Sequence, residues 1–217
     1  YLGLEITAAP LSLTQTAQTK TYGQTLAPVG TGAQASGVIN GVTVDGVTIN
    51  DVLDSFTMTS AGFAPTANIG TYAIAPGSLS FSTGSASNYA VSASAANVTV
   101  NRASLVVTAK NAVKFEGMPD TAGFLGVSYA GFANGETSAV LLSGGTTGIT
   151  VTRNNSSVNA IGAYPGVLIA AGPATRGNYA ITYAPGDFEV KVLPPNTLAV
   201  IADTYATYGT TGGVSAL

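Results

Sequence analysis

The chain has 217 residues, of which 8% are charged, and its seven basic and ten acidic residues give a net charge of −3 at pH 7. Typical domains carry roughly 25% charged residues, so the surface here must be neutral and polar, without the basic patch that attracts nucleic acid or an anionic membrane. Cysteine, histidine and tryptophan are absent, which excludes disulfides, thiol nucleophiles, histidine-based triads and the usual zinc sites. No apolar run approaches the ~18 residues that a membrane-spanning helix needs.

Short stretches of sequence recur along the chain at a nearly fixed distance. Residues 69–72 (IGTY) match residues 161–164 (IGAY), and residues 88–91 (NYAV) match residues 178–181 (NYAI). These pairs are separated by 92 residues (161 minus 69) and 90 residues (178 minus 88). About 90 residues can bury a workable but thin core, so the period indicates small domains repeated in tandem.

The repeat predicts four segments. Residues 1–9 read as the tail of a preceding repeat, because Leu4-Glu5-Ile6 aligns with the last strand of the later units. The opening lacks the basic and apolar regions of a signal peptide, so we expect the chain to be cut from a longer protein. The segments are residues 1–9, a first β repeat at 10–103, a second at 104–194, and the start of a third at 195–217.

The first repeat opens with an alternating strand at residues 11–14 and closes with strands between residues 88 and 100. Between them lie Asn40-Gly41 and Asp45-Gly46, which are both strong hairpin signals. Because they are only five residues apart, we expect one true hairpin and one loop. Residues 50–53 are expected to form a single helical turn.

The second repeat opens with a strand at residues 105–108 and is expected to contain a short helix at 137–142, with Asn134 as its cap and Glu136 in its first turn. Apolar and polar residues alternate over 179–183 and again over 188–192. This period of two is typical of strands with one buried face. The intervening Pro185-Gly186 predicts a turn.

The wording and order of these segments resemble the MBG and YDG-type repeats that occur in tandem in very large bacterial surface adhesins. Many of those adhesins are of the filamentous-haemagglutinin, two-partner-secretion kind. The first repeat here matches at its ends but carries residues 37–60 in place of the GFxNGE word. The resemblance implies a non-catalytic, β-rich spacer on a secreted or outer-surface protein. The words that carry it are residues 105–110 (LVVTAK), 115–117 (FEG), 131–136 (GFANGE), 162–164 (GAY), 178–183 (NYAITY) and 188–190 (FEV).

Three carboxylates of the second repeat are candidates for acid–base chemistry of the glycosidase kind: Glu116, Asp120 and Glu136. Spacing alone does not make a site, and we interpret these residues as flanking turns and the first turn of a helix. We therefore expect no enzymatic activity, no catalytic residue and no cofactor.

A cluster of oxygen-bearing side chains in the first repeat is a candidate for calcium binding. Neither an EF-hand loop nor a glycine-rich nonapeptide repeat is present, so we interpret these side chains as turn formers and caps and expect no metal site. The cluster comprises Asp45, Asn50, Asp51 and Asp54.

Five tyrosines alternate with aliphatic residues or occupy matching places in the two repeats, and we interpret them as core and sheet-face residues. Exposed rings could instead serve as platforms on which sugars stack, so the ligand-binding residues are left open. These tyrosines are Tyr72, Tyr89, Tyr164, Tyr179 and Tyr183.

The expected fold class is all-β, with tandem small β domains arranged end to end. Each domain is either an immunoglobulin-like sandwich or a β-grasp-like unit carrying the short helix. The expected function is a structural stalk on the bacterial cell surface, where the partners of each repeat are its neighbours in the chain. Binding of polysaccharide or host glycoprotein is the alternative, and self-association into fibres through neutral sheet edges is a third possibility. Nucleic acid and membrane insertion are not expected.

Overall fold

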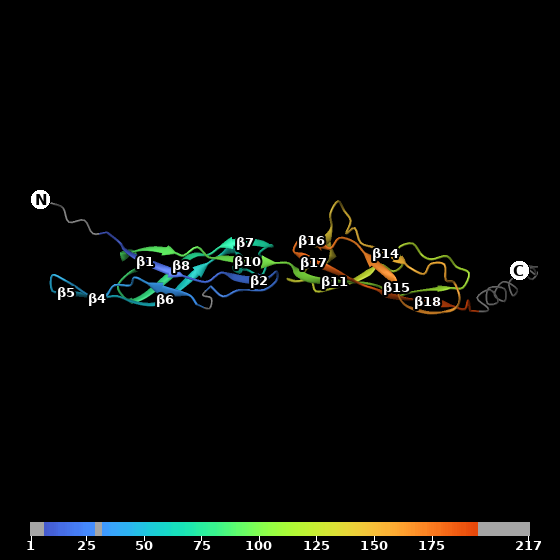
Figure 1. Ribbon diagram of the computed structural model, residues 1–217, viewed down its shortest axis with the longest axis horizontal. Coiled ribbons are helices and arrows are strands. Elements are labelled where there is room, and N and C mark those ends of the chain that lie inside the picture. Colours follow the sequence, from blue (N-terminus) through green and yellow to red (C-terminus); the bar gives the residue numbers. More distant parts are fainter. Residues whose placement is uncertain (1–6, 29–31, 195–217) are drawn as a thin grey trace, which may run out of the picture. The chain divides into compact units, whose positions relative to one another are not determined.

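The computed structural model describes residues 7–28 and 32–194 (Figure 1). The predicted start of a third repeat, residues 195–217, and most of the predicted tail at 1–9 therefore lie outside the described residues. Spatial proximity divides the chain into two compact units. The first unit holds the first repeat together with residues 129–148 and 173–182, and the second holds residues 107–128, 149–172 and 183 onward.

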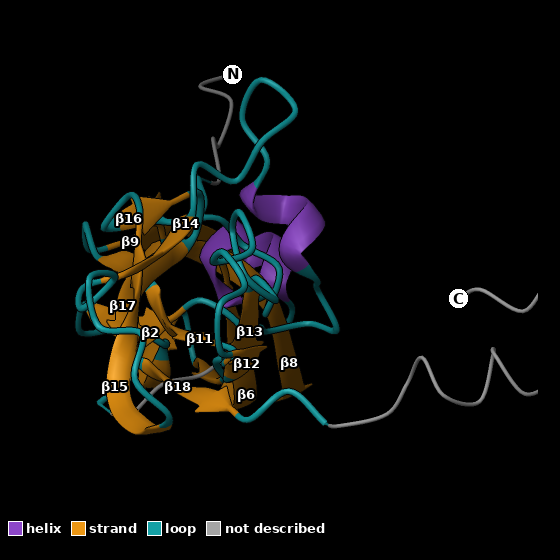
Figure 2. Ribbon diagram, turned by 90° about the vertical axis from the view of Figure 1, so that its right-hand side faces the viewer, coloured by secondary structure: helices purple, strands orange, loops and turns teal. Residues whose placement is uncertain are grey.

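Within residues 7–28 and 32–194, strands joined by loops make up the regular structure, with only short 3₁₀ turns between them (Figure 2). The all-β fold class predicted from the sequence is confirmed. In the first repeat the strands are β1 (Ala9–Thr14), β2 (Gln18–Thr21), β3 (Gln34–Ser36), β4 (Asn40–Val44), β5 (Val47–Asn50), β6 (Val52–Thr59), β7 (Gly70–Ala73), β8 (Ala75–Thr83), β9 (Tyr89–Ala93) and β10 (Asn97–Asn101), with 3₁₀ turns η1 (Ala61–Phe63) and η2 (Ala86–Asn88).

The second repeat follows after a single residue, Arg102, which separates β10 from β11. Its regular elements are β11 (Ala103–Ala109), β12 (Ala112–Phe115), β13 (Val127–Ala130), the 3₁₀ turn η3 (Ser138–Leu141), β14 (Thr150–Arg153), β15 (Gly162–Ala171), β16 (Thr175–Arg176), β17 (Tyr179–Ala184) and β18 (Gly186–Lys191).

The beginning and the end of each repeat run side by side. In the first repeat β1 pairs in parallel with β9, and the two segments then enter another sheet, where β2 pairs in parallel with β10. The second repeat has the sheet orders β13-β11-β17-β16 and β12-β18-β15-β14, and β12 is parallel to β18. The wholly antiparallel sheets of an immunoglobulin sandwich contain no such pairs. Because the first two strands of the first repeat, and β12 of the second, pair in parallel with strands from the end of the same repeat, each repeat is a mixed β structure.

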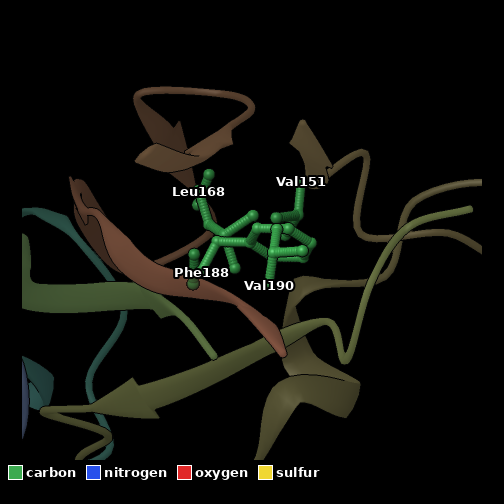
Figure 3. Close-up of a cluster of buried hydrophobic side chains, with 6 residues drawn as sticks. Val151, Leu168, Phe188 and Val190 are labelled. Atoms are coloured by element: carbon green, nitrogen blue, oxygen red, sulfur yellow. The ribbon is translucent and has the colours of Figure 1, made fainter. Parts of the chain in front are cut away.

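The apolar residues that alternate with polar ones in the sequence are the buried residues of their strands. Leu11 and Leu13 of β1 are fully buried, as are Leu105 and Val107 of β11. In the second unit Val151, Leu168, Phe188 and Val190 form the centre of a core cluster, and Figure 3 shows these four side chains gathered together. They come from β14, β15 and β18, which are neighbours in one sheet. Burying each such side chain contributes about 1.5–3 kcal/mol.

A charged group closes one side of this second core. The guanidinium of Arg153 lies 4.4 Å from the ring centroid of Phe188, a cation–π geometry. Its Nε is 3.0 Å from Asp120, and the Lys114 ammonium approaches the same carboxylate at 3.0 Å. Asp120 therefore neutralises two cations beside the core.

The hairpin prediction for the first repeat is confirmed at Asp45-Gly46, which joins β4 to β5. Both residues have positive φ, 48° and 78°, as the type I′ turn of a two-residue hairpin requires. Asn40-Gly41 instead lies at an irregularity at the start of β4. The helical turn expected at residues 50–53 was wrong, because Val52 and Leu53 enter β6 and pair with β8.

The short helix expected at 137–142 is a 3₁₀ turn, Ser138–Leu141. Its cap is Thr137, whose side chain accepts the backbone N–H of Ala139, so the assignment of the cap to Asn134 was wrong. Asn134 and Gly135 have φ values of 53° and 71° and form a tight turn, and Glu136 precedes the cap. None of the helical segments within 7–28 and 32–194 is long or apolar enough to cross a bilayer.

The predicted turn at Pro185-Gly186 is a crossover between sheets. β17 and β18 belong to different sheets, so the chain passes from one sheet to the other here and does not form a hairpin. Gly186 does not have the positive φ that was expected of a turn glycine. Its role is steric, because a Cβ there would collide with the backbone carbonyl of Ala109.

Leu168→Ala removes a fully buried side chain from the second core and should destabilise the chain by about 2–5 kcal/mol. Leu125→Ala is the matched control, because Leu125 is 63% exposed. Urea unfolding followed by near-UV circular dichroism measures the difference. Equal midpoints for the two variants would contradict the assignment of this core.

Candidate functional site

A buried tyrosine hydroxyl in the second repeat is bonded on both sides. Tyr179, at the start of β17, accepts a hydrogen bond from the backbone N–H of Ala133 at 3.0 Å and donates one to the carboxylate of Glu136. Burial, reinforced by the bond to Glu136, raises the pKa of Tyr179 to about 12. The neutral phenol is thus fixed as a donor to the carboxylate.

The first repeat contains the same arrangement with different residues. Tyr89, at the start of β9, accepts from the backbone N–H of Ile39 at 3.0 Å and donates to Asp51 Oδ2 at 2.7 Å. Burial is the main cause that raises the pKa of Tyr89, and the bond to Asp51 adds to it. Asp51 therefore plays in the first repeat the part that Glu136 plays in the second.

The two arrangements differ in the length of one turn. The backbone N–H of Glu136 donates to the carbonyl of Ala133 at 2.9 Å, and that of Asp51 donates to the carbonyl of Ile39, also at 2.9 Å. The first pair is three residues apart and the second twelve. The first repeat thus lacks the GFxNGE word only because a β4–β5 hairpin has been inserted into it, with Asp45-Gly46 in place of Asn134-Gly135.

In both repeats the segment that leads to the carboxylate begins with a glycine, Gly37 before Asp51 and Gly131 before Glu136. A side chain is excluded at both positions for the same reason. A Cβ on Gly37 would lie 2.5 Å from the carbonyl oxygen of Pro10, and one on Gly131 would lie 2.5 Å from that of Ser104. Real Cβ atoms do not approach so closely, and both glycines also have positive φ. The close approach brings the element that carries the carboxylate against the first strand of its repeat.

Glu136 also binds a tyrosine of the first repeat, within the first compact unit. The hydroxyl of Tyr22, just after β2, donates to Glu136 Oε1 at 2.6 Å. Its ring meets that of Tyr179 edge to face, with centroids 5.8 Å apart. Tyr22 is only 5% exposed. One carboxylate thus accepts hydrogen bonds from a tyrosine of each repeat.

The residue after Tyr22 has no room for a side chain. A Cβ on Gly23 would lie 2.6 Å from the Cβ of Ala133. The loop that follows is held by the ammonium of Lys20, which donates to the carbonyls of Gln24 and Ala64. Burial lowers the pKa of Lys20. Tyr22-Gly23 is therefore presented in a fixed conformation to the turn of the second repeat.

Amide side chains extend this contact. Asn134 Nδ2 donates to the carbonyl of Pro65 at 3.2 Å. Asn178 accepts from the backbone N–H of Ile69 at 3.1 Å and donates to Asn68 Oδ1 at 2.9 Å. We call the contact made by Tyr22, Gly23, Pro65, Asn68 and Ile69 with Ala133, Asn134, Glu136 and Asn178 the repeat joint. It is polar, and it joins side chains of the second repeat to side chains and backbone groups of the first.

The three carboxylates proposed for acid–base chemistry have separate partners. Glu136 accepts from two tyrosine hydroxyls and Asp120 neutralises two cations, as described above. The backbone N–H of Glu116 donates to the carbonyl of Lys191 at 2.9 Å, at the end of the β12–β18 pair. Glu136 belongs to the first compact unit, whereas Glu116 and Asp120 belong to the second.

Three of the four residues proposed for calcium have separate hydrogen-bond partners. Asp51 is bonded to Tyr89, Asp54 accepts the hydroxyl of Ser82 at 2.8 Å, and Asn50 accepts the N–H of Gly41 at 3.0 Å. Asp45 lies at the hairpin tip. In the described part of the chain no three acidic residues lie close enough together to hold a metal ion.

The remaining tyrosines occupy matching structural places. The hydroxyl of Tyr72 donates to the carbonyl of Asn68 at 2.9 Å, and that of Tyr164 donates to the carbonyl of Ala160 at 2.6 Å. Tyr89 and Tyr179 are buried and Tyr183 is half-buried. Sequence reasoning matched Tyr72 with Tyr164 and Tyr89 with Tyr179, but it missed the hydrogen-bond partners of Asp51 and Tyr22, which lie 38 and 114 positions away.

Replacing residues 40–50 by Asn-Gly should leave the first repeat folded, because Ala133 and Glu136 are joined by those two residues in the second. The Tyr89–Asp51 bond should form in the shortened protein. The signature, read in a Tyr179→Phe background so that Tyr179 does not contribute, is a tyrosine whose pKa is still raised when the absorbance at 295 nm is followed. Loss of cooperative unfolding in the shortened chain would contradict the equivalence.

The raised pKa of Tyr179 also predicts a pH dependence. The folded chain keeps a proton that the unfolded chain releases near pH 10, so this stabilisation is complete below pH 10 and is lost as the pH rises through about 12. Tyr179→Phe cannot ionise, so its free energy of unfolding should start lower and fall less steeply in this window. Urea titrations across the window measure both slopes. Parallel slopes would count against the assignment.

Comparison with known families gives two matches along the chain. The profile of the MBG domain (YGX type) matches residues 11–99 and residues 105–189. No curated protein and no solved structure matches the chain. The resemblance found in the sequence is thereby confirmed, and so is the prediction of small β domains in tandem. The chain belongs to the MBG domain (YGX type) family and carries two copies of that domain in succession.

Proposed function

We propose that this chain is a non-catalytic spacer segment of a large bacterial cell-surface or secreted adhesin, in which successive MBG repeats hold a distal binding region away from the cell. The family indicates a repeat module of large surface proteins, and modules of this kind are generally structural. The observation that carries the proposal is the repeat joint. Its Tyr22–Glu136–Tyr179 bonds attach part of the second repeat to the first.

Two features of the joint favour a spacer. Only Arg102 separates the last strand of one repeat from the first strand of the next, and a connection this short cannot behave as a flexible coil. The contacts beside it use a carboxylate, three side-chain amides and backbone groups. A bonded carboxylate of this kind is worth roughly 1.5–3 kcal/mol per hydrogen bond. Such a joint limits bending between consecutive modules.

The joint can be tested by a double-mutant cycle. Tyr22→Phe should destabilise the chain by about 1.5–3 kcal/mol, because one charge-assisted bond is lost. Combined with Glu136→Gln, the loss should be smaller than the sum of the two single losses. Tyr129→Phe is the control, because the hydroxyl of Tyr129 has no hydrogen bond within the described residues. Strict additivity would remove the coupling on which the joint depends.

The surface location requires an experiment on cells. An antibody raised against this chain should label intact bacteria that carry the full polypeptide, and external protease should remove the label. An internal deletion of both repeats should leave the adhesin on the surface but shorten its reach in electron micrographs. Label that appears only after the cells are lysed would contradict the proposal.

Glycan binding is a second candidate, favoured by one feature of the second unit. A pocket of about 500 Å³ there combines apolar side chains with acids and an amide, a mixture suited to sugar stacking and hydrogen bonding. Its lining includes Val113, Leu125, Tyr164, Pro165, Asn111, Asp187 and Glu189. If the pocket binds sugar, retention on a glycan array should be lost in Tyr164→Ala and kept in Tyr72→Ala, the matching tyrosine of the first repeat. Equal retention of both variants would exclude this pocket.

A further inference from the structure

The first repeat has a pocket at the place where the second repeat receives Tyr22. The pocket has a volume of about 540 Å³, and its lining includes Ile39, Asp51 and Asn88, together with residues 7–9. Ile39 and Asp51 correspond to Ala133 and Glu136 by their bonds to a tyrosine and to each other. Asn88 precedes Tyr89 as Asn178 precedes Tyr179. The pocket is therefore lined by the counterparts of the residues that form the second repeat's side of the joint.

The polar groups of this pocket have unused hydrogen-bonding capacity. Glu136 accepts one tyrosine on each oxygen, Tyr22 on Oε1 and Tyr179 on Oε2. Asp51 accepts Tyr89 on Oδ2, and its Oδ1 accepts no hydrogen bond from residues 7–28 or 32–194. The amide of Asn88 likewise makes no side-chain bond within these ranges, whereas that of Asn178 makes two.

The inserted hairpin adds an apolar surface beside the pocket. The pairing of β4 with β5 sets Val42 opposite Ile49 and Val44 opposite Val47, so all four lie on one face. The opposite face carries Thr43 and Thr48, whose hydroxyls are 2.9 Å apart. The four apolar side chains are 37–68% exposed, and Ile49 also lines the pocket. An isolated two-stranded hairpin is only marginally stable in water, so a covered apolar face would stabilise it.

We propose that this pocket is a socket for the Tyr-Gly strand end of an MBG repeat that precedes the first one in the full polypeptide. The incoming tyrosine hydroxyl donates to Asp51 Oδ1, the glycine passes close to Ile39, and the apolar face of the hairpin lies along the incoming repeat. The proposal rests on the repeat joint described above and does not depend on where the protein is located.

The chemistry of the socket selects among strand ends. A phenol can donate to a carboxylate, whereas a second carboxylate would be repelled. Tyr22-Gly23 has the required pair, and the sequence has it again at Tyr208-Gly209. The corresponding place in the second repeat is Glu116-Gly117. The second repeat of another copy of this chain therefore lacks the donor.

The test uses the whole chain and two peptides of equal length taken from its own sequence. Peptide 19–26 (TKTYGQTL) carries the Tyr-Gly pair, and peptide 113–120 (VKFEGMPD) carries Glu-Gly at the same place. In nuclear magnetic resonance titrations of the ¹⁵N-labelled chain, peptide 19–26 should cause saturable shifts at the amides of Ile39, Asp51 and Asn88. A version with Phe in place of the tyrosine should bind at least about tenfold more weakly, the loss of one charge-assisted bond. Peptide 113–120 should cause no saturable shift.

Asp51→Asn is the decisive variant. An asparagine carbonyl can still accept from Tyr89, but its amide cannot accept from a second phenol. The repeat should therefore stay folded, and peptide 19–26 should bind at least about tenfold more weakly. Unchanged shifts in this variant, or equal shifts with peptide 113–120, would overturn the proposal. Self-association of the chain that requires Asp51, seen by sedimentation, would overturn the assignment of the partner to a preceding repeat. Failure here leaves the Tyr22–Glu136 coupling intact, so the two proposals are separable.

Discussion

A partly buried carboxylate that accepts two tyrosine hydroxyls is the constraint on which this structure depends. Removing an acid from water costs several kcal/mol unless donors replace the water. In the second repeat the donors are the hydroxyls of Tyr179 and Tyr22. The first of these tyrosines belongs to the same repeat as Glu136 and the second to the repeat before it. The hydrogen bonds that Glu136 requires thus link the folding of the second repeat to the presence of the first.

The same constraint explains why an insertion is tolerated where it occurs. The tyrosine needs only a backbone N–H and a carboxylate at fixed places, and the hydrogen bond between Asp51 and Ile39 restores both after twelve residues, as the one between Glu136 and Ala133 does after three. The intervening chain is free to lengthen into a hairpin. Repeats of one family can therefore differ at this point while their cores stay alike.

The sequence predicted what depends on neighbouring residues. The period-two alternation located β1, β11 and β18. Asp45-Gly46 was one of two hairpin signals in the first repeat, because the positive φ angles of such a turn favour Asp and Gly. Residues 50–53 were misjudged because pairing with β8, far along the chain, overrode the local preference. Gly186 was misread because the carbonyl that excludes a side chain belongs to another strand.

The joint left no signal of this local kind. Tyr22 and Glu136 are 114 positions apart, and nothing in the words TYG and GFANGE indicates that one fits the other. Asp51 was hidden because the inserted hairpin moved it away from the spacing that the second repeat displays. The hydrogen bonds of Tyr89 and Tyr179 reveal that Asp51 corresponds to Glu136, since equivalent bonds persist where equivalent spacing does not.

The parallel pairing of the first and last strands has a mechanical consequence. When the two ends of the first repeat are pulled apart, β1 is drawn one way and β10 the other. The hydrogen bonds that join β1 to β9 and β10 to β2 then resist the sliding of one strand past its partner. All hydrogen bonds of a ladder loaded in this direction carry force together, whereas a hairpin pulled from its open end breaks them one at a time. A tether built from such repeats would hold under shear flow without lengthening until whole ladders gave way.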